Sequence, residues 1–232
     1  MQELEHDEDK RILNPADAQE KYVAFVDILG ISANVLRAFD TVLETYENLL
    51  RSLNLLRNVR PDVALSLYSD SFLLVSSHLG PLVAVTQAVH MQTLMWDCLV
   101  RGGIAYGRHL EVSLPPHLIM VSEPLVKAVA LESSLGNPCV ALHPDIAVPD
   151  SWWEGYERNL DRGLLYFGGQ RIVNPMNIAW GQSAGTRVTQ MLHDHPEYRD
   201  KYEWFLELYQ AVFSPVPMVP PKFFRVFSLL SG

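Results

Sequence analysis

Runs of apolar residues mark the strands that the sequence predicts, and apolar positions at helical spacing mark the helices between them. The first run, YVAFVDIL (residues 22–29), is apolar at almost every position, which is typical of a strand covered on both faces. Its one charged residue is Asp27, and Gly30 follows directly after the run. Residues 32–58 repeat apolar side chains every three or four positions, so we expect a helix there.

Shorter strands and further helices follow along the rest of the chain. Between residues 63–69 and 71–77 the turn signal is Ser69-Asp70-Ser71, so these two runs form either a tight hairpin or one long bent strand. The other predicted strands are 101–112, 139–146, 164–168 and 171–175, and the other predicted helices are 81–99, 122–134, about 183–195 and 197–213.

The helix at residues 122–134 has a clear start signal. Ser122 is the predicted N-cap, because a serine hydroxyl accepts a hydrogen bond from a free backbone N–H of the first turn. The apolar side chains of Leu125, Val129 and Leu131 are the predicted buried face.

The order of elements, β-α-β-β-α-β-α-β, favours an α+β fold. It fits a ferredoxin-like core, in which an antiparallel sheet carries helices on one face. We expect a flexible N-terminal arm at residues 1–18, a main domain over 19–180, and C-terminal helices with a proline-rich tail over 181–232.

Composition narrows the class of protein. A net charge of −9 and the lack of a long basic run disfavour nucleic-acid binding, although a free nucleotide stays possible if metal ions neutralise it. Cys98 and Cys139 have no CxxC spacing, which favours a reduced, cytosolic protein. The acidic N-terminus is unlike a signal peptide, and the longest apolar stretch, 82–100, contains too many polar residues for a membrane span.

The two aspartates at strand ends, Asp27 and Asp70, are the candidate chemistry. A single such carboxylate is more often a capping or turn residue. In a β-α-β-β sheet, however, the tip of the hairpin lies beside the end of the first strand, so the two carboxylates are expected to converge. Two close carboxylates either raise one pKa or hold a cation between them. Two divalent metal ions bound by Asp27, Asp70 and the backbone carbonyl of Ile28 would suit phosphoryl chemistry.

Four motifs resemble the class III nucleotidyl cyclases in order and spacing, over about residues 20–145. VDILGIS is similar to the first-strand signature of that family, and LYSDSFLLV to its second metal-binding segment, with Ser69 in place of the usual glycine. RGGIAYG is similar to a later strand of the family, and Ala130-Leu131-Glu132 to the end of its next helix.

The resemblance implies a cyclase domain over residues 19–180 and a two-metal mechanism. Asp27, Asp70 and Ile28 would bind two Mg²⁺ or Mn²⁺ ions, and backbone amides from Ile28 through Gly30 to Ser32 would hold the triphosphate. The ribose 3′-hydroxyl would then attack the α-phosphate and expel pyrophosphate. The sites would lie at the interface of a homodimer.

Three cations are candidate phosphate ligands. Arg101 and Arg108 flank the RGGIAYG strand, and either would suit the γ-phosphate, since a planar guanidinium matches phosphate oxygens; the alternative is a solvated strand end. Lys127 would stabilise charge on the α-phosphate from the partner chain, or is simply an exposed helix lysine.

The sequence differs from that of the purine cyclases at the positions that read the base, which suggests a substrate nucleotide with another base. Ser66 occupies the position of the lysine that reads the base in those enzymes, and Ile119 occupies the position of their base-reading aspartate. Val126 and Ala130 occupy the positions of the Asn and Arg that stabilise their transition state. The chain in this respect resembles the bacterial uridylate and cytidylate cyclases of the Pycsar anti-phage system, whose product acts on a separate cyclic-nucleotide-sensing effector. A bulky Tyr68 would fill a purine-sized slot, or is plain sheet surface.

The preferred hypothesis is therefore a pyrimidine cyclase that converts UTP, or else CTP, to the 3′,5′-cyclic monophosphate, with uridylate cyclase favoured. The alternatives are a purine cyclase, a cyclase-like module that binds nucleotide without turnover, and a structural dimerisation domain in which Asp27 and Asp70 only cap the sheet.

Overall fold

The fold is built on one sheet around strand β1 (Gln19–Ile28), the apolar run that carries Asp27. The computed structural model describes residues 13–31 and 38–223, apart from the side chains of residues 55–57. The other strands are β2 (Val63–Tyr68), β3 (Ser71–Ser76), β4 (Val100–Leu114), β5 (His117–Ser122), β6 (Val140–Leu142), β7 (Leu164–Phe167) and β8 (Gln170–Val173). The helices are α2 (Phe39–Val59), α3 (Leu79–Met95), α4 (Glu123–Ser134), α5 (Gly181–Asp194) and α6 (Arg199–Phe213), with 3₁₀ turns η1 (Pro15–Asp17), η2 (Asp150–Trp152), η3 (Asn159–Asp161) and η4 (Pro196–Tyr198).

The first four strands have the predicted ferredoxin-like arrangement. Their order in the sheet is β2-β3-β1-β4, and each neighbouring pair is antiparallel. The sheet then continues through β6, β8 and β7, and β5 pairs with the far part of β4. Among the described strands only β4 and β6 pair in parallel, so the complete sheet is mixed. The α+β fold class predicted from the order of elements is confirmed.

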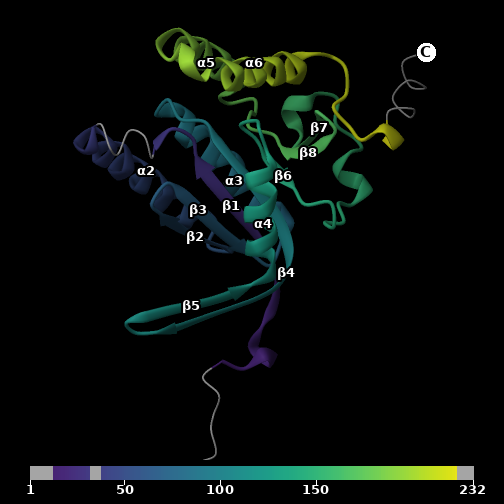
Figure 1. Ribbon diagram of the computed structural model, residues 1–232. Coiled ribbons are helices and arrows are strands. Elements are labelled where there is room, and N and C mark those ends of the chain that lie inside the picture. The colour runs from purple at the N-terminus through teal and green to yellow at the C-terminus, as the bar shows by residue number, and fades with distance from the viewer. Residues whose placement is uncertain (1–12, 32–37, 224–232) are drawn as a thin grey trace, which may run out of the picture.

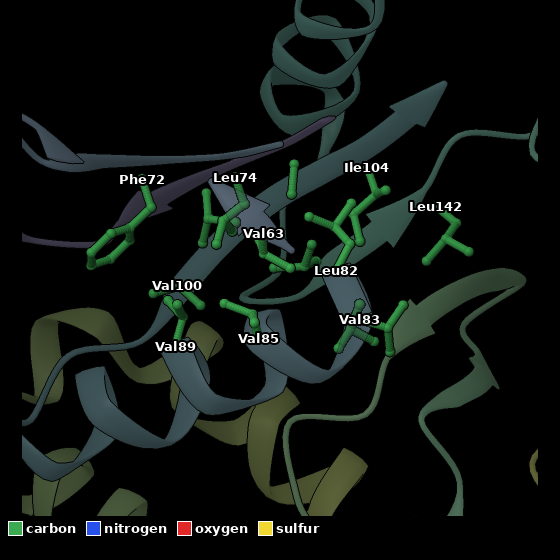
Figure 2. Packing of buried hydrophobic residues seen from close by; sticks show 14 of the residues in the cluster. Val63, Phe72, Leu74, Leu82, Val83, Val85, Val89, Val100, Ile104 and Leu142 are labelled. Carbon is green, nitrogen blue, oxygen red and sulfur yellow. The ribbon is translucent and has the colours of Figure 1, made fainter. Parts of the chain in front are cut away.

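Helices α2 and α3 cover one face of the sheet, as Figure 1 shows. Ala24, Val26 and Ile28 point to that face from β1 and belong to the larger hydrophobic core. Figure 2 shows α3 contributing Leu82, Val85 and Val89 to the same core, opposite strand residues such as Leu74 and Ile104. Burial of these side chains supplies most of the stability of this layer.

Helix α4 packs on the opposite face of the sheet, against β4 and β1 (Figure 1). A Cβ atom at Gly103 would lie 2.4 Å from the backbone oxygen of Ala128, so β4 needs glycine where α4 crosses it. The hydroxyl of Ser122 accepts a hydrogen bond from the Leu125 N–H at 3.1 Å, which confirms the predicted N-cap.

The C-terminal helices α5 and α6 lie over the edge of the sheet where β1 ends (Figure 1). They form a second core with β6 and β8, and its fully buried side chains include Ala141, Ile172, Val188 and Leu208. The second core lies on the same face of the sheet as α4, because Ala141 pairs with Gly103 across β4 and β6.

Several sequence predictions need correction. The helix expected at 81–99 begins at Leu79 and ends at Met95, and strand β5 was missed because SLPPH predicted only a loop. The buried residues of α4 are Pro124, Ala128 and Glu132. Of the predicted face, Leu125 and Leu131 are partly buried, but Val129 is exposed, so the prediction is wrong at Val129.

Part of the predicted helix at 32–58 lies outside the described residues, as do residues 1–12 of the predicted arm and 224–232 of the tail. In the part of the chain that the structure describes, none of the helices combines the length and the apolar character that crossing a bilayer requires.

Candidate active site

The end of β1 and the turn between β2 and β3 bring Asp27 and Asp70 together. The backbone N–H of Ile28 donates to the carbonyl oxygen of Asp70 at 2.8 Å, so the residue after Asp27 is bonded directly to Asp70. Asp27 pairs with Ser71 in the register of β1 and β3, and the Ser71 hydroxyl donates to Asp27 Oδ1 at 3.4 Å. The convergence that the strand order predicted is present in the structure.

Asp27 stands in a row of polar side chains that crosses the sheet. Tyr68 pairs with Ser71, which in turn pairs with Asp27. On its other side, Asp27 pairs with Arg101 of β4. Partner residues in antiparallel strands point to the same face, so the row lies on the face that carries α4. On the same face, at the end of β2, Tyr68 is half exposed, at 50 % relative exposure.

The electrostatics of this row favour a bound cation. Burial raises the pKa of Asp27 above its usual range, and the negative charges of Asp70 and then Glu132 raise it further. The positive charge of Arg101 and the hydrogen bond from Ser71 act in the opposite direction and do not cancel the effect. A carboxyl group whose ionised form is destabilised in this way gains from any cation placed beside it.

The donor set fits a hard divalent ion such as Mg²⁺ or Mn²⁺. Two carboxylates and a backbone carbonyl at Ile28 are oxygen ligands, and Mg²⁺ sites typically use one or two carboxylates and take their other ligands from water and phosphate. In the described residues no group of three or more His, Cys, Asp or Glu side chains is arranged to hold a metal ion. A metal at Asp27 and Asp70 would therefore depend on substrate oxygens to complete its coordination.

The turn that presents Asp70 is strained. Tyr68 pairs with Ser71, so Ser69 and Asp70 form a two-residue hairpin loop. Ser69 has a φ of 52°, a left-handed conformation that glycine adopts without steric cost. The hydroxyl of Tyr46 in α2 donates to the carbonyl oxygen of Ser69 and holds the turn in place.

We expect Ser69→Gly to raise the free energy of unfolding by about 0.5–1 kcal/mol. Relief of the left-handed strain gains about 1–2 kcal/mol, and the greater freedom of glycine in the unfolded chain offsets part of that gain. Urea denaturation would measure the change. The matched control is Ser113→Gly in the regular strand backbone of β4, which should lower stability; a loss at Ser69 as well would contradict the strain argument.

Arg101 lies beside Asp27 in the sheet, but its guanidinium is already hydrogen-bonded to other groups of the chain. Its Nε donates to Glu132 Oε1 at 2.6 Å, and its Nη1 donates to the carbonyl oxygen of Leu135 at 3.2 Å. Glu132 is 6 % exposed, so the pair is a buried link between β4 and α4. The structure therefore does not present Arg101 as a free ligand for the γ-phosphate.

Arg108 is not brought to the site. It pairs with Glu20 near the start of β1, seven residues along β4 from Arg101, which corresponds to about 23 Å of strand. Its Nη2 donates to the carbonyl oxygen of Pro15 at 3.4 Å. Within one chain, Arg108 therefore lies far from Asp27, and its predicted role in phosphate binding stays a prediction.

Lys127 lies on the outer part of α4 and forms an ion pair. Its Nζ is 3.3 Å from Asp145 Oδ2, and His143 Nδ1 lies 3.4 Å from the same oxygen. The Lys127 side chain is 39 % exposed, which leaves it accessible to a second chain. The structure of one chain does not bring Lys127 to Asp27.

The loop after β1 offers fewer backbone amides than the resemblance implied. The N–H of Ile28 is bonded to Asp70 and the N–H of Leu29 donates to the carbonyl oxygen of Leu99 at 2.9 Å, so both are used in the sheet. Gly30 follows with a φ of 86°, and a Cβ atom there would meet nothing within 4 Å. Ser32 lies outside the described residues.

Two features of this region escaped the sequence prediction. Glu132 was used only to align a motif, yet it is the buried partner of Arg101. A cavity of about 170 Å³ opens next to Leu29 and Gly30, and residues of the α5–α6 connection close it. No local sequence signal joins residue 30 to residues near 200; only the fold brings them together.

Comparisons with known proteins give similar folds and no established family. No protein-family model matches the chain, and no curated protein matches it. A bacterial light-regulated adenylyl cyclase has a TM-score of 0.49 at 14 % identity, over 75 % of this chain and 99 % of that one. The adenylyl cyclase CyaB from P. aeruginosa has a TM-score of 0.44 at 12 % identity, over 55 % of this chain and 78 % of its own.

A third similar structure is the guanylate cyclase domain of RhGC from Catenaria anguillulae in complex with GTP. Its TM-score is 0.43 at 15 % identity, over 53 % of this chain and 78 % of that one. Identities this low do not carry the activities of these proteins over to this chain, so the chemistry has to be argued from its own residues.

Proposed function

We propose that this protein is a metal-dependent nucleotidyl cyclase that acts on a pyrimidine nucleoside triphosphate. The observation that carries the proposal is the meeting of Asp27 and Asp70, joined through the hydrogen bond from the Ile28 N–H to the Asp70 carbonyl oxygen. Two partly buried carboxylates beside Glu132, with Arg101 as the opposing charge, create a site that gains from cations.

In this mechanism Asp27, Asp70 and the carbonyl oxygen of Ile28 would hold Mn²⁺ or Mg²⁺, two ions per site. Such ions would supply Lewis-acid activation of the ribose 3′-hydroxyl and would neutralise charge on the triphosphate. Ser71 orients Asp27 through its hydroxyl, and the buried pair of Arg101 and Glu132 fixes the strand end against α4. The chain thus contributes mainly positioning and electrostatic preorganisation, which are the main sources of catalysis in phosphoryl transfer.

The face of the sheet over β2 supports the choice of a pyrimidine. Ser66 and Tyr68 point to the same face as Asp27, and both are accessible to solvent. Serine in place of the lysine removes the cation that would read a purine, and the large Tyr68 side chain would fill part of a purine-sized slot. UTP is favoured over CTP as substrate, and the cyclic UMP or cyclic CMP formed would act in anti-phage defence on a separate cyclic-nucleotide-sensing effector.

A homodimer with the site at its interface is part of the proposal. The hairpin of β4 and β5 projects from the core, as Figure 1 shows, and exposes Leu118 and Val121. A two-stranded ribbon with apolar side chains is more stable when another surface covers it. Val126 on α4 is 71 % exposed, and with Lys127 it would face the partner chain in such a dimer.

The test is incubation of the purified protein with ATP, GTP, CTP and UTP in separate reactions with Mn²⁺, followed by mass spectrometry. We expect a 3′,5′-cyclic monophosphate and pyrophosphate from UTP, or from CTP. Product only from ATP or GTP would contradict the pyrimidine assignment. Four unchanged nucleotides, in protein that metal ions do stabilise, would contradict catalysis.

A second candidate function is a nucleotide-binding module without turnover. It is favoured by one observation: Val126 and Ala130 occupy the α4 positions where the related motif carries Asn and Arg, and both are exposed apolar side chains. Tight nucleotide binding without release of pyrophosphate would distinguish this function from the cyclase.

A further inference from the structure

We propose that the cavity between the end of β1 and helix α6 is the subsite for the terminal phosphates of the nucleotide, and that Lys201 is the cation that binds them. This inference rests on the proposed function, because it names the phosphate ligand of the same site. It assigns a substrate-binding role to the C-terminal helical pair of the chain itself.

The need for such a cation follows from the candidate site. A triphosphate carries several negative charges, and Asp27, Asp70 and Glu132 add carboxylates of their own. Arg101 is occupied by Glu132, and Arg108 lies at the far end of β4. The metal ions would neutralise part of this charge, but the terminal phosphates still require a positive group near the strand end.

The cavity lies in the right place. Its walls include Leu29 and Gly30, and Gly30 is three residues beyond Asp27. Three residues of chain span at most about 11 Å, which is within the reach of an extended triphosphate whose α-phosphate lies at the aspartates. Because a Cβ atom at Gly30 would meet nothing within 4 Å, the backbone there is open to a ligand.

Lys201 offers an available positive charge inside this cavity. Its Nζ lies 5.6 Å from the centroid of the Tyr198 ring, and both residues line the cavity. In the described residues, no ion pair joins Lys201 to a carboxylate. A lysine held over an aromatic ring is partly oriented but keeps its N–H donors for a phosphate.

The two acidic residues that line the cavity, Asp97 and Glu197, contact an arginine and a histidine, respectively. Asp97 Oδ1 is 2.6 Å from Arg187 Nε, and Glu197 Oε1 is 3.4 Å from His195 Nδ1. The Arg187–Asp97 pair limits the repulsion that an incoming phosphate would meet, whereas His195 offsets the charge of Glu197 only when its imidazole is protonated. Asp97 also has a φ of 57°, a left-handed conformation that aspartate adopts more readily than most residues.

The experiment measures binding of inorganic tripolyphosphate, in the presence of Mg²⁺, by isothermal titration calorimetry. This probe has no ribose and cannot be cyclised, so the result does not depend on turnover. We expect Lys201→Ala to weaken binding about 10- to 100-fold, as expected for loss of a charged hydrogen bond. Lys201→Arg should stay within about threefold of the wild type, since it keeps the positive charge.

The matched control is Arg199→Ala, which removes an exposed cation two residues away on the same helix that is paired with Glu203. It should leave the affinity unchanged, and UMP should bind Lys201→Ala as well as it binds the wild type, because UMP lacks the terminal phosphates. Unchanged tripolyphosphate affinity in Lys201→Ala, an equal loss in Arg199→Ala, or no binding to the wild type would overturn the inference.

Failure of the inference and failure of the proposed function give different results. If no nucleotide is turned over but tripolyphosphate binding still depends on Lys201, the phosphate subsite is supported and the proposed cyclase activity is contradicted. If cyclic product forms and Lys201→Ala changes neither KM nor kcat, the cyclase activity is supported and the phosphate subsite is contradicted.

Discussion

Asp27→Asn is expected to abolish cyclase activity while making the metal-free protein more stable. Loss of the carboxylate that is proposed to bind both metal ions should lower kcat/KM by roughly 1000-fold, comparable with loss of other main electrostatic groups in active sites. The stability gain follows from the raised pKa of Asp27, which shows that its ionised form is unfavourable in the folded protein. Mass spectrometry of the nucleotide products and thermal unfolding in EDTA would measure the two effects.

The effect of Asp27 on the stability of the folded protein depends on pH. Because the pKa of Asp27 is raised on folding, ionisation of this residue lowers stability as pH rises above the unfolded value near 4 and through the folded pKa. At pH 7 the carboxylate is ionised and unfavourable, and asparagine removes that cost. Since the side chain is only partly buried, the expected gain is at most about 1 kcal/mol, or roughly 2–4 °C in Tm.

Thermal unfolding with and without metal ions distinguishes the proposed metal binding of Asp27 from the cost of its charge in the metal-free protein. A saturating metal at a hundredfold its Kd stabilises a folded protein by about 2.7 kcal/mol, so Mn²⁺ should raise the Tm of the wild type and not that of Asp27→Asn. Asp62→Asn is the control, since Asp62 is exposed and lies at the opposite end of β2. If Asp27→Asn keeps more than a tenth of the activity, or still responds to Mn²⁺, Asp27 is not a metal ligand.

Arg101→Ala should destabilise the fold by about 3 kcal/mol. The substitution leaves the buried Glu132 without the guanidinium that binds it at 2.6 Å, and an uncompensated buried charge is costly. Urea denaturation would measure the loss. The double variant Arg101→Met with Glu132→Leu should recover to within about 1 kcal/mol of the wild type, because both charges are then absent.

An exposed ion pair, Arg158 with Asp161, is the control for the stability loss expected in Arg101→Ala. Arg158 Nε lies 2.9 Å from Asp161 Oδ2 on the surface, and Arg158→Ala should change stability by no more than about 0.5 kcal/mol. If Arg101→Ala leaves stability unchanged and instead raises the KM for the nucleotide, Arg101 is the phosphate ligand that the sequence suggested, and the ion pair with Glu132 is not structural.

The sequence predicted the parts of this fold that local patterns determine. The apolar run of β1 is visible because Val23, Ala24 and Val26 are buried before Asp27. The sequence allowed either a hairpin or one long bent strand at Ser69 and Asp70, and the structure has the hairpin. The N-cap at Ser122 is equally local, since the donor and acceptor are three residues apart.

The parts that depend on tertiary packing could not be predicted in this way. The inward face of α4 uses the small Ala128 and the charged Glu132, because β4 passes closely at Gly103 and presents Arg101 beside it. Hydrophobicity alone points to Val129 instead, which is partly exposed. Lys201 is a further case: it is the one lysine of α6, and only the fold places it in the same cavity as Gly30.

The position of Asp27 within β1 also has a consequence for folding fidelity. Strand neighbours can slip by one residue during assembly, and such a slip turns every side chain to the other face of the sheet. In β1 a slip would bury the Asp27 carboxylate among Val85, Val89 and the rest of the larger core, at a cost of several kcal/mol, and would expose Val26 and Ile28. The same charge that is proposed to bind metal therefore selects against misregistered sheets, and neutral substitutions at Asp27 should fold with less selective strand pairing.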